Sequence, residues 1–383
     1  MNAPARIVGR DPANGQGMAV HCADGRITGV APVAADDNMP FLSAGFVDLQ
    51  VNGYAGHDLN DGVPSRETLE ALASRLLQAG VTCFAPTLIT ASETALCAAL
   101  RGIATARRQS QLLSQMIAFV HVEGPSLDPA DGPRGAHPLE HVRAPSLDEF
   151  ARWQEAGEGL VGMVTLSPHY PEAPAYIRAL AEQGVLVSIG HTGASPEEIV
   201  AAADAGARLS THLGNGAANL LPRHPNFIWA QLSDDRLTAS FIADGHHLPP
   251  ATLKAMLRAK TLERSILVSD AAALGGQKPG RYTSPIGGEV EVSADGRLGV
   301  AGTPYLAGAG HLLDRNIAHV MAAAGLSLSE ALALATHNPG RFAGGRGVLA
   351  PGARADITLF SWQPGDAELT IESVFLAGER ASK

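Results

Sequence analysis

The chain has 383 residues, 45% hydrophobic and 17% charged, which is enough apolar material for a buried core and argues against intrinsic disorder. Its 28 basic and 38 acidic residues give a net charge of −10 without any long basic run, so nucleic acid and anionic membranes are not expected partners. Three cysteines without CxxC spacing indicate neither disulfides nor a thiolate metal site. With no apolar leader or membrane span in the sequence, we expect a cytoplasmic protein.

The two ends of the chain differ from its middle. The first part alternates short apolar pieces with turn signals such as Asp24-Gly25, and the tail has a Pro351-Gly352 turn followed by a strand-like run. The length suits one large domain and one small one. We therefore predict a small β-sandwich domain made from both ends, residues 1–44 with 346–383, and one large domain, residues 45–345.

In the middle of the chain, amphipathic segments end at a glycine and a β-rich run follows at once. This pattern predicts helices over residues 66–79, 173–183 and 196–205, which stop at Gly80, Gly184 and Gly206. Glycine at that position supplies the left-handed residue that closes a helix. The Ser-x-x-Glu pattern of a capping box, which marks a helix start, begins at Ser146, Ser195 and Ser327.

Continuous apolar runs, typical of strands buried on both faces, occur at residues 81–84, 117–122, 162–166, 185–189, 209–211, 237–243 and 265–269. Their alternation with helices predicts a parallel sheet covered by helices. The number of repeats, and the absence of a GxGxxG motif after any strand, favour a closed (β/α)8 TIM-type barrel over an open doubly wound sheet.

In such a barrel the active site lies where the strands end, and Glu123, His191 and His212 each follow a predicted strand. One carboxylate and two imidazoles suit Zn²⁺ or a similar borderline ion and leave a coordination position for water. A single histidine at such a place is often structural. Three ligand-type residues at three strand ends favour a metal site.

Asp270 ends the apolar run Ile-Leu-Val-Ser, where an unpaired carboxylate is costly. It therefore needs a cation or a proton-transfer role, and a carboxylate beside an activated water can act as general base and then as general acid. The alternative is an ordinary helix N-cap for the residues from Ala271 onward.

These residues lie in motifs that resemble the amidohydrolase superfamily and, within it, the N-acetylglucosamine-6-phosphate deacetylases. Residues 347–356 are similar to the superfamily's closing β-domain signature. The other motifs run in the family's order: Gly45–Gly53, His121–Pro125, Arg134–Pro138, Gly190-His191, Thr211–Asn215, Ala243–His247, Ser269–Ala271 and Leu306–Gly308.

The resemblance implies metal-dependent hydrolysis of the N-acetyl group of N-acetylglucosamine 6-phosphate to glucosamine 6-phosphate and acetate, in amino-sugar catabolism. It implies one divalent metal, Zn²⁺ with Fe²⁺ as the alternative, on Glu123, His191 and His212. Asp270 would be the catalytic acid and base, and His137 would polarise the acetyl carbonyl and stabilise its oxyanion. Family members are typically homodimers, so a homodimer is expected here.

The same resemblance implies the residues that hold the substrate. Arg223 would clamp the phosphate of the sugar, although a solvated loop arginine is the alternative. The full set of expected substrate-binding residues is Ala136, Asn215, Gly216, Arg223, His247, Leu306, Ala307 and Gly308.

Two departures from the pattern leave questions open. Where the superfamily usually has His-x-His after its first barrel strand, this chain has Gln50-Val51-Asn52, which favours a single metal because neutral amides hold a divalent cation poorly. Gly214 and Gly216 also differ from relatives, so the exact acyl-amino sugar, and whether it must be phosphorylated, stays open.

Two other functions compete with this one. One is an amidohydrolase that acts on another N-acyl amino sugar or a cyclic amide, but such cyclic-amide relatives commonly keep the first-strand His-x-His. The other is a non-catalytic sugar-phosphate-binding barrel, which the intact ligand set and Asp270 argue against.

Overall fold

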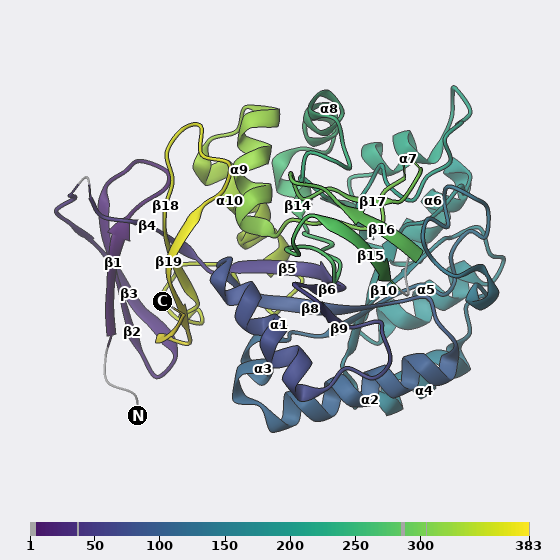
Figure 1. The fold of residues 1–383 in the computed structure, drawn as a ribbon, viewed down its shortest axis with the longest axis horizontal. Coiled ribbons are helices and arrows are strands. Elements are labelled where there is room, and N and C mark those ends of the chain that lie inside the picture. The colour runs from purple at the N-terminus through teal and green to yellow at the C-terminus, as the bar shows by residue number, and fades with distance from the viewer. Residues whose placement is uncertain (1–4, 37, 285–287, 304, 383) are drawn as a thin grey trace.

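The computed structural model describes residues 5–36, 38–284, 288–303 and 305–382. The parts of the two predicted domains at residues 1–4, 37, 285–287, 304 and 383 lie outside the described residues. Figure 1 shows a large barrel wrapped by helices and, beside it, a smaller sheet where both ends of the chain lie. No helix in the described part of the chain combines the length and the apolar character needed to cross a membrane.

Eight strands form one sheet in the order β14-β13-β12-β11-β10-β9-β8-β5, and each neighbouring pair is parallel. The two edges of this sheet meet, because Val51 pairs with Ala271 and the Asn52 N–H donates to the Ala271 carbonyl at 2.9 Å. The predicted (β/α)8 TIM-type barrel is therefore confirmed. Its strands are β5 (Phe46–Val51), β8 (Val81–Ile89), β9 (Val120–Glu123), β10 (Val161–Leu166), β11 (Leu186–Ile189), β12 (Leu209–Ser210), β13 (Thr238–Phe241) and β14 (Ser265–Leu267).

Helices surround the barrel, and three of them end within one residue of the predicted position. Gly80, Gly184 and Gly206 follow α1, α5 and α6 with φ of +83°, +77° and +124°, as left-handed helix stops require. The helices are α1 (Arg66–Gln78), α2 (Glu93–Gln109), α3 (Gln111–Met116), α4 (Leu147–Ala156), α5 (Ala173–Glu182), α6 (Pro196–Ala205), α7 (Phe227–Ser233), α8 (Pro250–Lys260), α9 (Leu313–Ala324), α10 (Leu328–Ala335) and α11 (His337–Gly340), with 3-10 turns η1 (Leu139–His141) and η2 (Leu262–Arg264).

Two of the three predicted capping boxes form in full. Ser195 and Ser327 each exchange both hydrogen bonds with the glutamate three residues on. Ser146 makes only half of the box: it accepts the Glu149 N–H, but the Glu149 carboxylate binds Arg143 at 3.0 Å instead of turning back to the cap. An available guanidinium therefore outcompetes the backbone N–H for that carboxylate.

One predicted strand starts later than expected. The apolar run from Ile117 begins as a helix end, because α3 precedes it and the Ile117 N–H still donates to the Leu113 carbonyl at 2.9 Å. The strand β9 itself begins at Val120 and includes Glu123. Hydrophobicity alone does not separate a buried helix end from a strand start.

The small β domain contains strands from both ends of the chain, as predicted. Its seven strands form one sheet in the order β20-β19-β18-β4-β1-β2-β3, and the two chain ends join where Thr358 pairs with Ser43. The domain boundaries drawn from the sequence stay a prediction. The strands are β1 (Ala5–Arg10), β2 (Gly17–Ala23), β3 (Arg26–Val33), β4 (Phe41–Ala44), β18 (Ile357–Ser361), β19 (Thr370–Leu376) and β20 (Glu379–Ser382).

A three-stranded antiparallel sheet between β14 and α9 has no counterpart in the sequence prediction. Its last strand pairs through Gly299 with Leu306, and Ala309 pairs with Ala271. This insertion thus carries the segment around residues 306–308 to the chain that follows β14. The strands are β15 (Gly280–Ser284), β16 (Gly288–Val292) and β17 (Leu298–Val300), and a short hairpin of β6 (Gly53–Tyr54) and β7 (His57–Asp58) follows β5.

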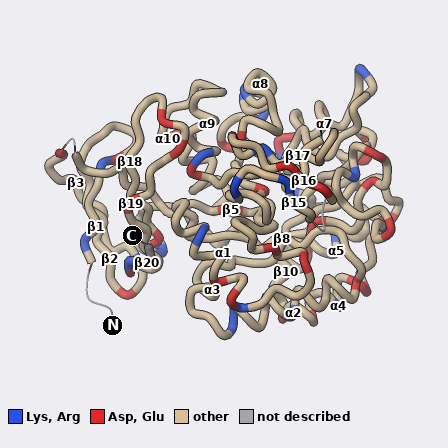
Figure 2. The backbone as a smooth tube through the Cα atoms, in the orientation of Figure 1, with Lys and Arg blue, Asp and Glu red and all other residues tan. Residues whose placement is uncertain are grey.

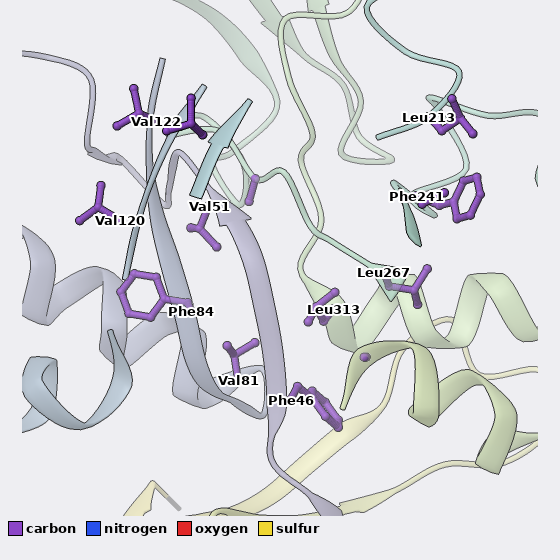
Figure 3. Close-up of a cluster of buried hydrophobic side chains, with 14 of the residues drawn as sticks. Phe46, Val51, Val81, Phe84, Val120, Val122, Leu213, Phe241, Leu267 and Leu313 are labelled. Atoms are coloured by element: carbon purple, nitrogen blue, oxygen red, sulfur yellow. The ribbon is translucent and has the colours of Figure 1, made fainter. Parts of the chain in front are cut away.

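The alternation of side chains along β9 places one functional residue inside the barrel. Val120 and Val122 belong to the buried cluster between the strands and the helices, which Figure 3 shows with Phe84 and Val81. Successive side chains of a strand point to opposite faces. The side chain of Glu123, the last residue of β9, therefore points into the barrel, where it is almost fully buried.

Candidate active site

Three side chains meet where β9, β11 and β12 end. Ligand atoms of Glu123, His191 and His212 all lie within 4.8 Å of one another, although the residues are far apart in the chain. The Nε2 atoms of His212 and His191 lie 3.0 and 3.5 Å from the same carboxylate oxygen, Glu123 Oε1. Convergence of parallel strand ends produces this cluster.

Contacts around the imidazoles fix their direction. His191 Nδ1 lies 2.8 Å from the Pro133 carbonyl, so Nδ1 carries the hydrogen and Nε2 keeps its lone pair for the centre. A Cβ at Gly216 would lie 2.7 Å from His191 Nδ1, so the chain passes very close to the ring. The His137 ring packs edge-on against His191, with ring centroids 4.4 Å apart.

Three of the expected site residues have left-handed backbone conformations. His191, His212 and Asp270 have φ of +49°, +27° and +49°. A non-glycine residue in this region costs on the order of 1–3 kcal/mol, and such residues cluster at functional sites. The turns at the strand ends thus hold these three residues in a conformation that costs local backbone stability.

The buried charge at the centre suits a cation. Burial by itself raises the pKa of Glu123, but the imidazoles of His191 and His212 outweigh burial and hold that pKa well below its usual range. Burial lowers the pKa of His212, and the Glu123 carboxylate more than offsets this, so the net direction is upward. A carboxylate and two imidazole nitrogens that converge on one point fit a divalent metal of the Zn²⁺ or Fe²⁺ type.

Asp270 follows β14 and can exchange a proton near neutral pH. Burial, reinforced by the charge of Glu123, raises the pKa of Asp270 to about 6. One of its oxygens, Oδ1, accepts a hydrogen bond from Asn52 Nδ2 at 2.7 Å. Its place directly after β14, beside the end of β5 where the barrel closes, agrees with a residue at the mouth.

The Gln-x-Asn segment at the end of β5 contacts the two carboxylates. Gln50 Nε2 donates to Glu123 Oε1 at 2.8 Å, while Thr211 Oγ1 donates to Gln50 Oε1 at 2.9 Å. Asn52 contacts Asp270 as described above. Both amides therefore donate hydrogen bonds to carboxylates.

His137 is buried and neutral. Burial, with the neighbouring His191, lowers the pKa of His137 to about 3. Its Nδ1 lies 2.9 Å from Thr90 Oγ1, and its Nε2 lies 3.9 Å from Glu123 Oε2, at the edge of the cluster. A neutral imidazole held in this way can donate one N–H to a ligand.

Several expected substrate-binding residues lie around this cluster. Asn215 is held by its Nδ2, which donates to the His212 carbonyl at 3.1 Å, and Gly216 passes against His191. Ala136 is exposed and directly precedes His137. The segment Leu306–Gly308 approaches the residues after Asp270, since a Cβ at Gly308 would lie 2.7 Å from the Ala272 Cβ.

His247 follows β13 and is fixed by an acid three residues earlier. Its Nδ1 lies 2.7 Å from Asp244 Oδ2, while the backbone N–H groups of His246 and His247 both donate to Asp244 Oδ1 at 2.9 Å. This arrangement leaves His247 Nε2 free to contact a ligand.

The structure does not bring Arg223 into the cluster of its own chain. Arg223 is exposed on the loop before α7 and makes no ion pair with any residue that the structure describes. Figure 2 shows a loop that projects beyond α7. Leu220 on the same loop is 90% exposed.

Four residues that orient the site have no role in the sequence prediction. Thr90 contacts His137, Thr211 contacts Gln50, Asp244 contacts His247 and the Pro133 carbonyl contacts His191. Asp244 and Thr211 lie inside two of the family motifs and close to the ends of predicted strands, so the sequence could have identified them as site residues. A backbone carbonyl such as that of Pro133 carries no sequence signal.

Comparison with known proteins agrees with this architecture. The profile of the Amidohydrolase family matches residues 41–381. The N-acetylgalactosamine-6-phosphate deacetylase of Escherichia coli O157:H7 is 31% identical over 94% of this chain and 93% of its own length. The human N-acetylglucosamine-6-phosphate deacetylase is 32% identical over 91% of this chain and 85% of its own.

Solved structures give the same result. A mutant of the N-acetyl-D-glucosamine-6-phosphate deacetylase from Mycobacterium smegmatis, in complex with N-acetyl-D-glucosamine-6-phosphate, is 32% identical with a TM-score of 0.83 and covers 95% of this chain and 94% of its own. The chain therefore belongs to the amidohydrolase family, a metal-dependent superfamily of hydrolases. Its resemblance to the deacetylases of that family, predicted from the sequence motifs, is confirmed.

Proposed function

We propose that this protein hydrolyses the N-acetyl group of N-acetylglucosamine 6-phosphate to glucosamine 6-phosphate and acetate, in amino-sugar catabolism. The observation that carries the proposal is the meeting of Glu123, His191 and His212 at the barrel mouth, in a chain whose relatives bear that activity in their names. In Figure 1 the arrow of β5 points away from the small β domain, so the carboxyl end of this strand lies on the side opposite that domain.

Glu123, His191 and His212 would hold one divalent cation. We propose Zn²⁺, with Fe²⁺ as the alternative, because two imidazoles and a carboxylate accommodate either ion. When bound, the cation supplies Lewis acidity to the acetyl carbonyl and to the attacking water.

Asp270 moves the proton. As a carboxylate it takes one proton from the attacking water, and the oxygen of that water forms the new bond to the carbonyl carbon. The same proton then passes from Asp270 to the sugar nitrogen as the C–N bond breaks, so acetic acid and a free amine form. The acid then gives up the second proton of the water and becomes acetate. The raised pKa of Asp270, about 6 because of its burial, suits both directions of transfer.

His137 stabilises the carbonyl oxygen as negative charge develops on it. Its low pKa, about 3 through burial, keeps the ring neutral, so Nε2 can donate a hydrogen bond without carrying a charge. On the opposite edge of the ring, Nδ1 lies 2.9 Å from Thr90 Oγ1, which holds the ring in place.

The sugar and its phosphate would be held by the residues around the cluster. Asn215, the Gly216 backbone and His247 are proposed to bind the sugar phosphate, and Arg223 to clamp the phosphate. The remaining sugar contacts are proposed for Ala136, Leu306, Ala307 and Gly308.

We propose a homodimer in which Arg223 serves the partner's site. Arg223 lies on an exposed loop with Leu220, which is 90% exposed, and the helix α7 that follows the loop has the 54% exposed Trp229. Apolar surface of this kind commonly marks an interface. Mixing a subunit with Arg223→Ala and a subunit with Asp270→Asn tests this. Activity well above that of either parent supports a shared site, whereas no gain in a verified mixed dimer contradicts it.

We propose a cytoplasmic location because of the state of the cysteines. Cys22, Cys83 and Cys97 are all free and buried, as is common in a reducing compartment. Cell fractionation of the native host tests this, and recovery of the protein outside the cytoplasm would contradict it.

A second substrate is favoured by the relatives themselves. Two of them, from Escherichia coli O157:H7 and a Shewanella strain, are named N-acetylgalactosamine-6-phosphate deacetylases, and they are 31% and 33% identical to this chain. The two hexosamines differ only in the configuration at one carbon. Acetate release should therefore be measured for both sugars, with and without the 6-phosphate, on protein whose metal content is known.

The decisive variant is Asp270→Asn. We expect it to lose turnover by about 10²- to 10⁴-fold, the usual contribution of acid–base catalysis, with metal content unchanged. Loss of metal in this variant would instead make Asp270 a ligand. Wild-type protein that carries metal but releases no acetate from either sugar phosphate would remove the proposed substrate.

A further inference from the structure

The end of β5 contacts both carboxylates of the proposed site with two different amides. Gln50 Nε2 reaches Glu123 Oε1 at 2.8 Å, and Asn52 Nδ2 reaches Asp270 Oδ1 at 2.7 Å. Gln50 is fully buried. Because Gln50 and Asn52 are two residues apart on one strand end, a single structural element reaches both groups.

Asn52 is fixed relative to Asp270 by the backbone around it. The Asn52 N–H donates to the Ala271 carbonyl at 2.9 Å, and the Asp270 N–H donates to the Gln50 carbonyl at 3.0 Å. These bonds form the seam where the barrel closes. The side-chain bond from Asn52 to Asp270 therefore spans a rigid seam, and it holds a carboxylate whose own backbone is strained at φ +49°.

Gln50 is fixed by a different partner. Thr211 Oγ1 donates to Gln50 Oε1 at 2.9 Å, which requires the Gln50 NH₂ group to face Glu123. Thr211 directly precedes His212, so this chain of hydrogen bonds links two members of the metal cluster. Gln50 contacts no atom of Asp270 among the side-chain hydrogen bonds of the described residues.

Amides suit this position because they donate a hydrogen bond but neither gain nor lose a charge in the physiological pH range. Asn52 occupies Oδ1 of Asp270 and leaves Oδ2 as the oxygen that gains and loses the proton. A histidine or a carboxylate at residue 52 would compete for that proton.

We propose that Gln50 and Asn52 are positioning residues with divided roles: Gln50 orients Glu123 for the metal, and Asn52 orients Asp270 for proton transfer. This inference rests on the proposed function, and it extends that function to two residues that bind neither the metal nor the substrate. It requires that loss of the two amides have different consequences.

The test uses three variants of full-length protein, each of which replaces an amide by an apolar side chain: Gln50→Leu, Asn52→Leu and Asn316→Leu. Leucine is nearly isosteric with asparagine and one heavy atom smaller than glutamine. Asn316 is the matched control, since it is fully buried and its Nδ2 donates to the Val268 carbonyl at 3.3 Å, in the segment between β14 and Asp270, without a side-chain hydrogen bond to a carboxylate among the described residues. Asn52→Asp serves as a second variant that keeps the shape if the leucine disturbs folding. Metal affinity is measured by Zn²⁺ titration, and kcat and KM are measured per bound metal.

Asn52→Leu and Asn52→Asp should lower kcat per bound metal by about 10- to 100-fold, with Zn²⁺ affinity and KM within about twofold of wild type. Gln50→Leu should weaken Zn²⁺ affinity by about 10- to 100-fold while kcat per bound metal stays within about twofold. Asn316→Leu should lower thermal stability and leave both quantities unchanged.

Unchanged kcat per bound metal in both Asn52 variants would overturn the role of Asn52. A loss of activity in these variants that is fully explained by weaker Zn²⁺ binding would overturn it as well. Unchanged Zn²⁺ affinity in Gln50→Leu would overturn the role of Gln50. Failure of the proposed function is recognised separately, because wild-type protein would then show no deacetylation at full metal loading, while the Zn²⁺ titration would still report on Gln50.

Discussion

Asp48 on β5 is a buried acid whose ionisation should make the protein less stable as the pH rises from about 4 to 7. Its side chain is fully buried; Oδ1 accepts the Ser269 N–H at 3.1 Å, while Oδ2 has no partner among the described residues. Burial, reinforced by the charge of Asp270, raises the pKa of Asp48 from 3.8 to about 7. The folded state therefore keeps this carboxyl protonated where the unfolded state releases the proton.

The sign and size of the pH effect on stability follow from this difference in protonation. Below pH 4 the group is neutral in both states, and between pH 4 and 7 each unit of pH costs about 1.4 kcal/mol because only the unfolded state ionises. Above pH 7 both states are ionised and the loss levels off at about 4 kcal/mol. Asp48→Asn keeps a carbonyl acceptor for Ser269 but has no charge, so it should escape this loss.

The free energy of unfolding should be measured by urea denaturation of both proteins, saturated with metal, from pH 5 to 8. The free energy of unfolding of Asp48→Asn, relative to that of wild type, should increase by about 3 kcal/mol across this range, with most of the increase below pH 7. The difference between the two proteins cancels the titration of all other groups. A difference that does not vary with pH would refute the reasoning, since Asp48 would then be ionised in the folded protein throughout.

Three further outcomes are expected. Glu123→Gln should bind Zn²⁺ at least about tenfold more weakly, because it loses the only anionic member of the ligand set; equal affinity in a Zn²⁺ titration would argue against Glu123 as a ligand. Arg223→Ala should raise KM for the phosphorylated sugar by about 10- to 100-fold while KM for the unphosphorylated sugar hardly changes, and equal effects on both would remove the phosphate role. Thr90→Val should lower kcat by roughly tenfold with metal content intact, because His137 Nδ1 loses the hydroxyl at 2.9 Å and keeps only the longer bond from the backbone N–H of residue 90 at 3.4 Å; an unchanged kcat would show that the Thr90 hydroxyl does not orient the ring.

The sequence predicted the barrel from short-range signals. Helix stops at glycine, capping boxes and apolar strands are local features, and each depends on residues within one or two turns. Glu123, His191, His212 and Asp270 could be found in the same way, because each directly ends or follows an apolar strand and parallel strand ends must converge. The motif resemblance then assigned chemistry to positions that the pattern had already selected.

Only the tertiary structure decided how those residues are held. The bond from Gln50 to Glu123 joins residues 73 apart in the chain, and the bond from Asn52 to Asp270 joins residues 218 apart. Such contacts depend on which strands close the barrel, and a one-residue change of register would send the side chains to the opposite face. The sheet of β15 to β17, and the exposed position of Arg223, likewise depend on packing between distant segments. Local propensity fixes which residues end a strand, whereas the closure of the barrel fixes which atoms they meet.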